Sequence, residues 1–395
     1  MTDQAMTTAA RTGYDLMRAA MRNLPAQNIA DIAKLGFGRD DIIPLWFGEG
    51  DLPTPQFICD AASRAMAAGH TFYTHQNGIP ELCEALSRYQ TRLFGREIPP
   101  ERITVTPGGM AAILLSVQMV MDAGDNIITI DPVWPNIRGA VQLMGGERRS
   151  LRMRLGETGW ELDMEALRAA CDGQTRAIFL ASPGNPTGWI MPPDQQRELL
   201  AFCRERGIWI IADEVYVRFH YGQPVAPSFL QIAEPEDPVL VVNSFSKSWS
   251  MTGWRIGWLT HPPSCRRTQA MLVQYNTSGT ATFLQHAAVT AIEEGEGYVE
   301  SYRDRSRRGR DIVCDALGNL PRVRLASRPE GGLYVYMKVE GVSDSRAFCE
   351  KLFLDTGVGL APGFAFDDDD MVRICFGTDP DLIAEAMERI RPHFR

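Results

Sequence analysis

Short, mostly apolar runs alternate with helix-like segments through the middle of the chain. Five of these runs have the length and composition of a buried strand: residues 102–105 (RITV), 126–130 (NIITI), 176–181 (RAIFLA), 208–212 (IWIIA) and 239–242 (VLVV). Segments between them, such as residues 194–207 (DQQRELLAFCRERG), have the pattern of a helix. This alternation predicts an α/β fold in which helices cover both faces of a mostly parallel sheet.

The pattern changes in the last third of the chain. Residues 331–339 (GGLYVYMKV), 348–363 and 371–377 (MVRICFG) predict a smaller α+β unit. The last of these segments alternates less cleanly than a half-buried strand does.

Residues that can carry chemistry follow three of the predicted strands. Asn185 lies in the turn after the third strand, Asp213 directly follows the fourth, and Lys247 follows the fifth. Ligands of open α/β sheets bind beyond the carboxyl ends of the strands, so we expect these side chains to lie close together.

Each of these signals also has a simpler interpretation. Asp213 alone could cap a helix or turn, and Lys247 alone could be a surface lysine. The turn TPGGMAA (106–112) is either a tight strand-to-helix turn or a phosphate cradle, because glycines allow close backbone approach. Arg255 lies between two tryptophans, and a buried cation is costly unless an anion meets it. Because such residues occur together at the ends of successive strands, the combination favours one shared site over the separate simpler interpretations.

Composition excludes several classes of function. The formal net charge of −9 and a pI near 5.3 argue against nucleic acid as a partner. The eight cysteines form no CxxC pair and the six histidines show no ligand spacing, so we expect reduced thiols and no metal site. No secretory signal and no apolar run of membrane-spanning length is present in the sequence, so we expect a cytoplasmic protein without a membrane partner.

Motifs along nearly the whole chain resemble those of the class I/II aminotransferases, which are fold-type I, pyridoxal-phosphate-dependent enzymes of the aspartate aminotransferase-like superfamily. The motifs are, in order, GEGDLPTP (48–55), YTHQNGIPELCEAL (73–86), TPGGMAA, DPVWPN, SPGNPTG, ADEVY, SFSKSWSMTGWRIGW (244–258) and VRICFG (372–377). The resemblance implies a large domain, with a mostly parallel seven-stranded sheet between helices, and a smaller α+β domain. We therefore expect an N-terminal segment (1–50) that belongs to the small domain, a large cofactor-binding domain (51–291) and a C-terminal small domain (292–395).

The resemblance also implies roles for the residues after the strands. Lys247 would form a Schiff base with the aldehyde of pyridoxal 5'-phosphate and then move a proton from the substrate Cα as general base. Asp213 would keep the pyridine nitrogen protonated, which makes the ring a better electron sink. Tyr216 and Asn185 would hydrogen-bond the phenolic oxygen of the ring.

A second group of residues would hold the rest of the cofactor. Arg255, Ser244 and the backbone N–H groups of Gly109 and Met110 would bind the phosphate, and Trp134 would stack on the ring. Met110 departs from the family pattern, which often has a polar side chain there, so the phosphate would depend on backbone donors at that position.

Substrate and subunit contacts complete the implied site. Arg373 would bind the substrate α-carboxylate, assisted by Asn185 and by the Gly48 backbone, although a strand arginine in a surface ion pair is the simpler interpretation of that residue. Tyr73 would reach the cofactor phosphate of a neighbouring subunit, which implies a homodimer with sites at the interface. The N-terminal segment 14–28 and residues 279–283 are also expected to line the pocket.

The implied function is a transaminase that moves an amino group between an L-amino acid and a 2-oxo acid by a ping-pong mechanism. A carbon–sulfur β-lyase or decarboxylase on the same scaffold remains an alternative, because the same residues would serve it. A transcription regulator is disfavoured by the acidic charge. No motif fixes the substrate. Arg138 is a candidate for binding a distal carboxylate, although a solvated helix arginine is the simpler interpretation. The run Asp367 to Asp370 is expected to be a solvated loop.

Overall fold

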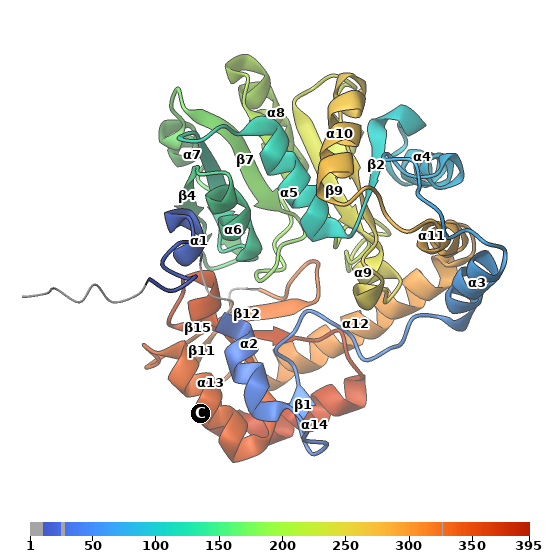
Figure 1. The fold of residues 1–395 in the computed structure, drawn as a ribbon. Coiled ribbons are helices and arrows are strands. Elements are labelled where there is room, and N and C mark those ends of the chain that lie inside the picture. Colours follow the sequence, from blue (N-terminus) through green and yellow to red (C-terminus); the bar gives the residue numbers. More distant parts are fainter. Residues whose placement is uncertain (1–10, 25–27, 326) are drawn as a thin grey trace, which may run out of the picture.

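The computed structural model describes residues 11–24, 28–325 and 327–395 of the chain. Within these residues, seven strands form a large sheet in the order β2-β10-β9-β8-β7-β3-β4 (Figure 1). They are β2 (Ile103–Thr106), β3 (Asn126–Asp131), β4 (Glu147–Arg152), β7 (Thr175–Ala181), β8 (Trp209–Asp213), β9 (Val239–Ser244) and β10 (Gly257–Thr260). Only β10 runs antiparallel to its neighbours among these paired strands, so the predicted mostly parallel sheet is confirmed.

Alternate residues of the central strands pack into two separate cores. In β8, Ile210 and Ala212 belong to the core that includes residues of α7 and α8, whereas Ile211 belongs to the core that includes residues of α5 and α6. The helices on this sheet are α5 (Gly109–Val120), α6 (Asn136–Leu143), α7 (Met164–Ala170), α8 (Pro193–Arg206) and α10 (Arg266–Asn276). Burial on both faces explains why these strands are apolar at successive positions.

A second sheet forms the centre of the smaller unit in the lower half of Figure 1. Its strand order is β11 (Val323–Arg324), β12 (Tyr334–Val339), β15 (Met371–Cys375) and β14 (Ala361–Pro362), all antiparallel. The helices of this unit include α12 (Glu296–Leu317), α13 (Ser345–Thr356) and α14 (Pro380–Ile390). Every residue of β15 is buried, which explains its weak alternation in sequence.

Residues 28–44 of the N-terminal segment lie with the smaller unit, whereas residues 20 and 23 accept hydrogen bonds from Gln142 of α6 on the large sheet. Strand β1 (Ile43–Pro44) pairs in parallel with β13 (Val358–Gly359).

The remaining α-helices of the described residues are α1 (Ala19–Arg22), α2 (Asn28–Ala33), α3 (Gln56–Ala67), α4 (Pro80–Phe94), α9 (Phe245–Ser248) and α11 (Thr282–Glu294). The expected boundary after residue 291 falls inside α11, and the division into domains stays a prediction. In the part of the chain that the structure describes, no helix has the length and apolar character needed to cross a membrane.

Candidate active site

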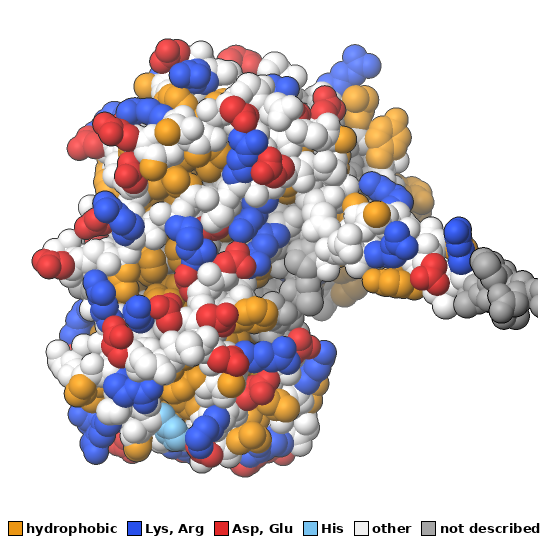
Figure 2. All heavy atoms as spheres, turned by 90° about the vertical axis from the view of Figure 1, so that its left-hand side faces the viewer, with side chains coloured by type: hydrophobic (Ala, Val, Ile, Leu, Met, Phe, Trp, Pro, Cys, Tyr) orange, Lys and Arg blue, Asp and Glu red, His pale blue; other side chains and the backbone are white. Residues whose placement is uncertain are grey.

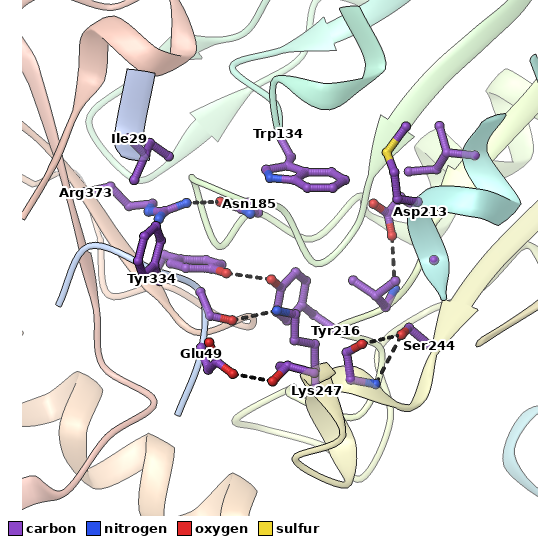
Figure 3. Close-up of a pocket in the computed structure, with 18 of the residues that line it drawn as sticks. Ile29, Glu49, Trp134, Asn185, Asp213, Tyr216, Ser244, Lys247, Tyr334 and Arg373 are labelled. Carbon is purple, nitrogen blue, oxygen red and sulfur yellow. Dashed lines mark hydrogen bonds between the residues drawn. The ribbon is translucent and has the colours of Figure 1, made fainter. Parts of the chain in front are cut away.

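A cavity of about 350 Å³ lies where the carboxyl ends of the central strands face the smaller sheet (Figure 3). Its volume is in the range of small-molecule sites. All the residues predicted to form the site except Tyr73 line this cavity: Gly48, Gly109, Met110, Trp134, Asn185, Asp213, Tyr216, Ser244, Lys247, Arg255 and Arg373. The structure therefore brings together side chains from positions more than 300 residues apart in the sequence.

Lys247 projects into the cavity from α9, the short helix that follows β9. The Ser244 side chain caps this helix by accepting a hydrogen bond from the Ser246 N–H at 3.1 Å. The Lys247 Nζ donates to the backbone oxygen of Gly48 at 2.6 Å. Burial lowers the pKa of Lys247, so its amine is more readily neutral than a surface lysine.

Asp213 is the last residue of β8 and is 6% exposed. Among the described residues, only the Val215 backbone N–H donates to its side chain, at 3.3 Å. Burial raises the pKa of Asp213 to about 6, although the Val215 N–H and the charge of Lys247 act in the opposite direction. Because a single hydrogen bond offsets the cost of burying this carboxylate, the carboxylate is suited to pairing with a cationic group of a ligand.

Two buried tyrosines meet beside the lysine. The hydroxyl of Tyr216, three residues after Asp213, lies 2.5 Å from the hydroxyl of Tyr334 in β12. Trp134 lies across the cavity from Tyr216 and Lys247 (Figure 3). A Cβ at Gly48 would lie only 1.9 Å from the Tyr334 hydroxyl oxygen, so only glycine fits at position 48.

Arg373 reaches the opposite end of the cavity from β15. Its Nη1 donates to Asn185 Oδ1 at 2.8 Å, and its Nη2 donates to the backbone oxygen of Trp46. The guanidinium carbon lies 4.5 Å from the Tyr334 ring centroid and 5.0 Å from that of Phe366. Arg373 is 2% exposed, its Nε is buried without a partner, and no carboxylate of the described residues pairs with it. The surface ion pair that is the simpler interpretation of this residue is therefore absent.

The start of α5 and Arg255 form a cradle for an anion. Gly108 has a φ of +90°, and a Cβ there would lie 2.4 Å from the Arg255 Nη2. Gly109 approaches Ser244, whose Cβ would lie 3.5 Å from a Cβ added at Gly109. Free N–H groups at the helix start and a guanidinium thus converge, which is the arrangement that binds phosphate.

Two sequence expectations differ from the structure, and one, the loop at 367–370, is met in part. Arg138 does not line the cavity, because its Nη1 pairs with Asp367 Oδ1 at 2.7 Å and its Nη2 donates to the Ala365 oxygen at 2.7 Å. The run 367–370 is a turn in which Asp367 and Asp369 are exposed, as expected, but its carboxylates are paired. Asp367 also pairs with Arg148, and the following aspartates contact Arg152, Tyr336, Ser345 and Lys338. Of the described residues in segments 14–28 and 279–283, none lines the cavity.

Tyr73 lies outside the cavity and is 95% exposed. Its predicted contact is with a second subunit, so this placement leaves the prediction as it stands.

The sequence did not single out eight residues that line the cavity, namely Ile29, Phe47, Glu49, Ile113, Val215, Ser246, Thr252 and Tyr334. Ser246 and Thr252 stand inside the motif that contains Lys247, and Glu49 follows Gly48, so proximity in sequence was an available signal. Tyr334 and Tyr336 stand in the same strand, and no pattern in the sequence distinguishes the one that reaches the cavity.

Comparison with known proteins places these features in a family. The model of the family described as aminotransferase class I and II matches residues 41–390. The aspartate aminotransferase of Thermotoga maritima is 32% identical over 352 residues, which cover 89% of this chain and 91% of that protein. The aspartate/prephenate aminotransferase of Thermus thermophilus is 33% identical over 353 residues, covering 88% and 90%. The crystal structure of the Thermotoga maritima enzyme superposes with a TM-score of 0.88 and covers 95% of this chain and 99% of that one, at 30% identity.

Proposed function

The chain belongs to the class I and II aminotransferases, and from this premise we propose that it binds pyridoxal 5'-phosphate in the cavity and there moves an amino group between an L-amino acid and a 2-oxo acid in a ping-pong reaction. When bound, the cofactor supplies an aldehyde that takes the amino group and a conjugated ring that withdraws electrons from the substrate Cα. The observation that carries the proposal is the presence of Lys247, Asp213 and the Arg255 cradle in one cavity.

The chemistry of these groups fits the cofactor. Asp213 has no cationic partner within ion-pair distance among the described residues, and a protonated ring nitrogen would supply one. Arg255 and the start of α5 would hold the phosphate dianion. Tyr216 and Asn185 both reach the cavity and would hydrogen-bond the phenolic oxygen of the ring, with Trp134 on its face.

Lys247 is proposed to move the proton at the substrate Cα. A general base must be neutral in a useful fraction of molecules near pH 7, and burial of Lys247 lowers its pKa in that direction. The Gly48 carbonyl accepts from Nζ at 2.6 Å and so holds the lysine side chain inside the cavity. Arg373 is proposed to bind the substrate α-carboxylate, because its buried Nε still lacks a partner.

We also propose that the protein is a homodimer. Three large aromatic side chains are exposed on neighbouring segments: Phe72 (84%), Tyr73 (95%) and Tyr275 (83%). The Thr282 hydroxyl donates to the Phe72 oxygen at 3.2 Å, and Gln76 bonds Gln274, so these segments lie side by side. Exposed aromatic groups of this kind mark a protein interface, and Tyr73 would there meet the phosphate in the other subunit. A cytoplasmic location is supported by the eight free cysteines.

The test is a spectral titration of the cofactor-loaded protein. An L-amino acid should bleach the visible absorbance of the bound cofactor, and a 2-oxo acid should restore it. Lys247→Ala should lose turnover, whereas Lys351→Ala, whose side chain is 73% exposed and outside the cavity, should keep it. Pyruvate and ammonia released without an acceptor would favour the β-lyase alternative, and a protein that cannot be loaded with the cofactor would overturn the proposal.

A further inference from the structure

We propose that the substrate pocket selects amino acids with uncharged, apolar side chains and discriminates against aspartate and glutamate. This inference rests on the proposed function, and it departs from the aspartate for which the relatives are named. It starts from the charges in the cavity. Among the described residues, the cations that line the cavity are Lys247, Arg255 and Arg373. The segments outside the described residues (1–10, 25–27 and 326) contain no lysine, arginine or histidine.

Each of these cations already has a partner or a proposed role. Arg255 faces the start of α5 and donates from Nη1 to the Thr252 oxygen at 2.7 Å, so it belongs to the phosphate cradle. Lys247 is the amine that the reaction itself requires. Arg373 is held by Asn185 and would be occupied by the α-carboxylate that every amino-acid substrate carries. Among the described residues of one subunit, no cation is left in the cavity for a second carboxylate.

The walls near Arg373 are apolar. Ile29, from α2, lies next to the Arg373 guanidinium, and Trp134 faces it across the cavity (Figure 3). Phe47, which follows the residue whose carbonyl accepts from Arg373, adds further apolar surface to the lining. A side chain that extends from a carboxylate bound at Arg373 would therefore meet hydrocarbon and aromatic rings, which favour an apolar group by burial.

The surrounding charges make a second carboxylate less favourable still. Glu49 lines the same cavity, where it accepts a hydrogen bond from the Thr252 hydroxyl. Arg138, on the neighbouring helix α6, is held outside the lining by Asp367 and the Ala365 oxygen. A carboxylate buried without a cation beside an existing carboxylate carries a desolvation cost that an apolar side chain avoids. The pocket thus attracts apolar side chains through its walls and disfavours acidic side chains through Glu49 and the lack of a free cation among the described lining residues.

Binding of two unreactive acids to the cofactor-loaded enzyme separates these classes. Maleate carries two carboxylates, and 3-phenylpropionate carries one carboxylate and a phenyl group. We expect calorimetry to give a Kd for 3-phenylpropionate at least about tenfold lower than the Kd for maleate, the scale of discrimination for an apolar pocket. Half-reactions followed by the absorbance of the bound cofactor should give the same order, with L-phenylalanine and L-methionine ahead of L-aspartate and L-glutamate in kcat/KM.

A matched pair of variants tests the wall itself. Ile29→Lys places a cation beside Arg373 and should tighten maleate binding while weakening 3-phenylpropionate binding. Ile29→Gln has a similar length without the charge, and should weaken 3-phenylpropionate binding without any gain for maleate. An Ile29→Lys protein that folds and keeps the wild-type ratio would overturn the assignment of this wall to the substrate side chain.

The ratio of the Kd for maleate to the Kd for 3-phenylpropionate in the wild-type enzyme tests the proposal even if a variant does not fold. Maleate binding as tight as that of 3-phenylpropionate, or aspartate turned over as well as phenylalanine, would overturn the apolar selectivity and leave transamination intact, since the amino-group transfer itself would still be observed. Failure of every amino acid to bleach the bound cofactor, or of every 2-oxo acid to restore it, would instead overturn the proposed function.

Discussion

The hydroxyl oxygens of Tyr216 and Tyr334 lie 2.5 Å apart and connect the end of the large sheet to the smaller one. Tyr216 follows β8, and Tyr334 begins β12. Burial raises the pKa of both hydroxyls, so each keeps its proton near pH 7. If Tyr334 donates to Tyr216, the proton of Tyr216 is free to point at a ligand, and the bond makes Tyr216 a stronger donor.

Tyr334→Phe should therefore weaken the contact of Tyr216 with the bound cofactor. A hydrogen bond to the ionised phenolic oxygen of the ring favours its deprotonated form, so the visible absorbance should titrate at a higher pH in the variant. Turnover should fall roughly three- to tenfold, the effect of one hydrogen bond of about 1 kcal/mol. The matched control is Tyr221→Phe, which removes a hydroxyl that donates to Gly332 outside the cavity. An unchanged titration in Tyr334→Phe would show that the pair has no influence on the cofactor.

Arg373 is expected to bind the α-carboxylate, the group that all substrates share. Arg373→Ala should raise KM at least about tenfold for every amino acid and every 2-oxo acid, because a charge-assisted bond in a buried site is lost. Arg373→Lys keeps the charge but loses the planar fork held by Asn185, so it should recover only part of the affinity. Steady-state kinetics with several substrates measure both variants. A rise in KM confined to one amino acid would mean that Arg373 binds a side chain instead.

The sequence predicts the site best where its residues belong to local motifs. Asp213 ends one strand with an unbroken apolar run, and Lys247 lies three residues after the end of the neighbouring one, so a parallel sheet brings them together. The sequence predicts edge elements less well. Strand β4 has the sequence ERRSLR, and its side chains are exposed or half-buried. Its charged residues give no strand-like apolar pattern, although it pairs along its whole length with β3.

Contacts between the two units could not be read from the sequence. The run 367–370 has the composition of a solvated loop, but Asp367 meets Arg138 and Arg148, which stand more than 200 positions earlier. Nothing local to the run encodes those partners. Because the partner of Arg138 also lies far away in the sequence, the sequence alone leaves Arg138 available for a substrate carboxylate.

The contacts of Asp367 lead to a prediction about stability. Its carboxylate lies 2.7 Å from Arg138 Nη1 and 3.1 Å from Arg148 Nη2, and so joins both units. Asp367→Asn removes the charge without backbone strain, because its φ of +65° suits asparagine as well. The side chain is 37% exposed, so we expect a loss of about 1 kcal/mol in the free energy of unfolding, and a smaller loss in 1 M salt.

Urea denaturation at low and high salt measures this effect. Asp194→Asn is the matched control, because Asp194 is 92% exposed and pairs only within α8 with Arg197. That control should change stability little at either salt concentration. A loss in Asp367→Asn that is equal at both salt concentrations would contradict an electrostatic contribution.

Glu214, next to Asp213, gives the protein a stability that depends on pH. It is 1% exposed, its Oε1 accepts from the Phe229 N–H at 3.1 Å, and its Oε2 is buried without a partner. Burial raises the pKa of Glu214 to about 8, so the folded protein holds this proton where the unfolded chain, with a pKa near 4.5, releases it. The stabilisation is complete below pH 4.5 and is lost as the pH rises through 8. The glutamine of Glu214→Gln cannot ionise, so the free energy of unfolding of this variant should rise relative to that of the wild type as the pH increases from 6 to 8. This range lies above the pKa of about 6 at Asp213, so the titration of Asp213 interferes little. Urea denaturation of both proteins across this range measures the difference, and a constant difference would show that Glu214 ionises in the folded protein as readily as in the unfolded chain.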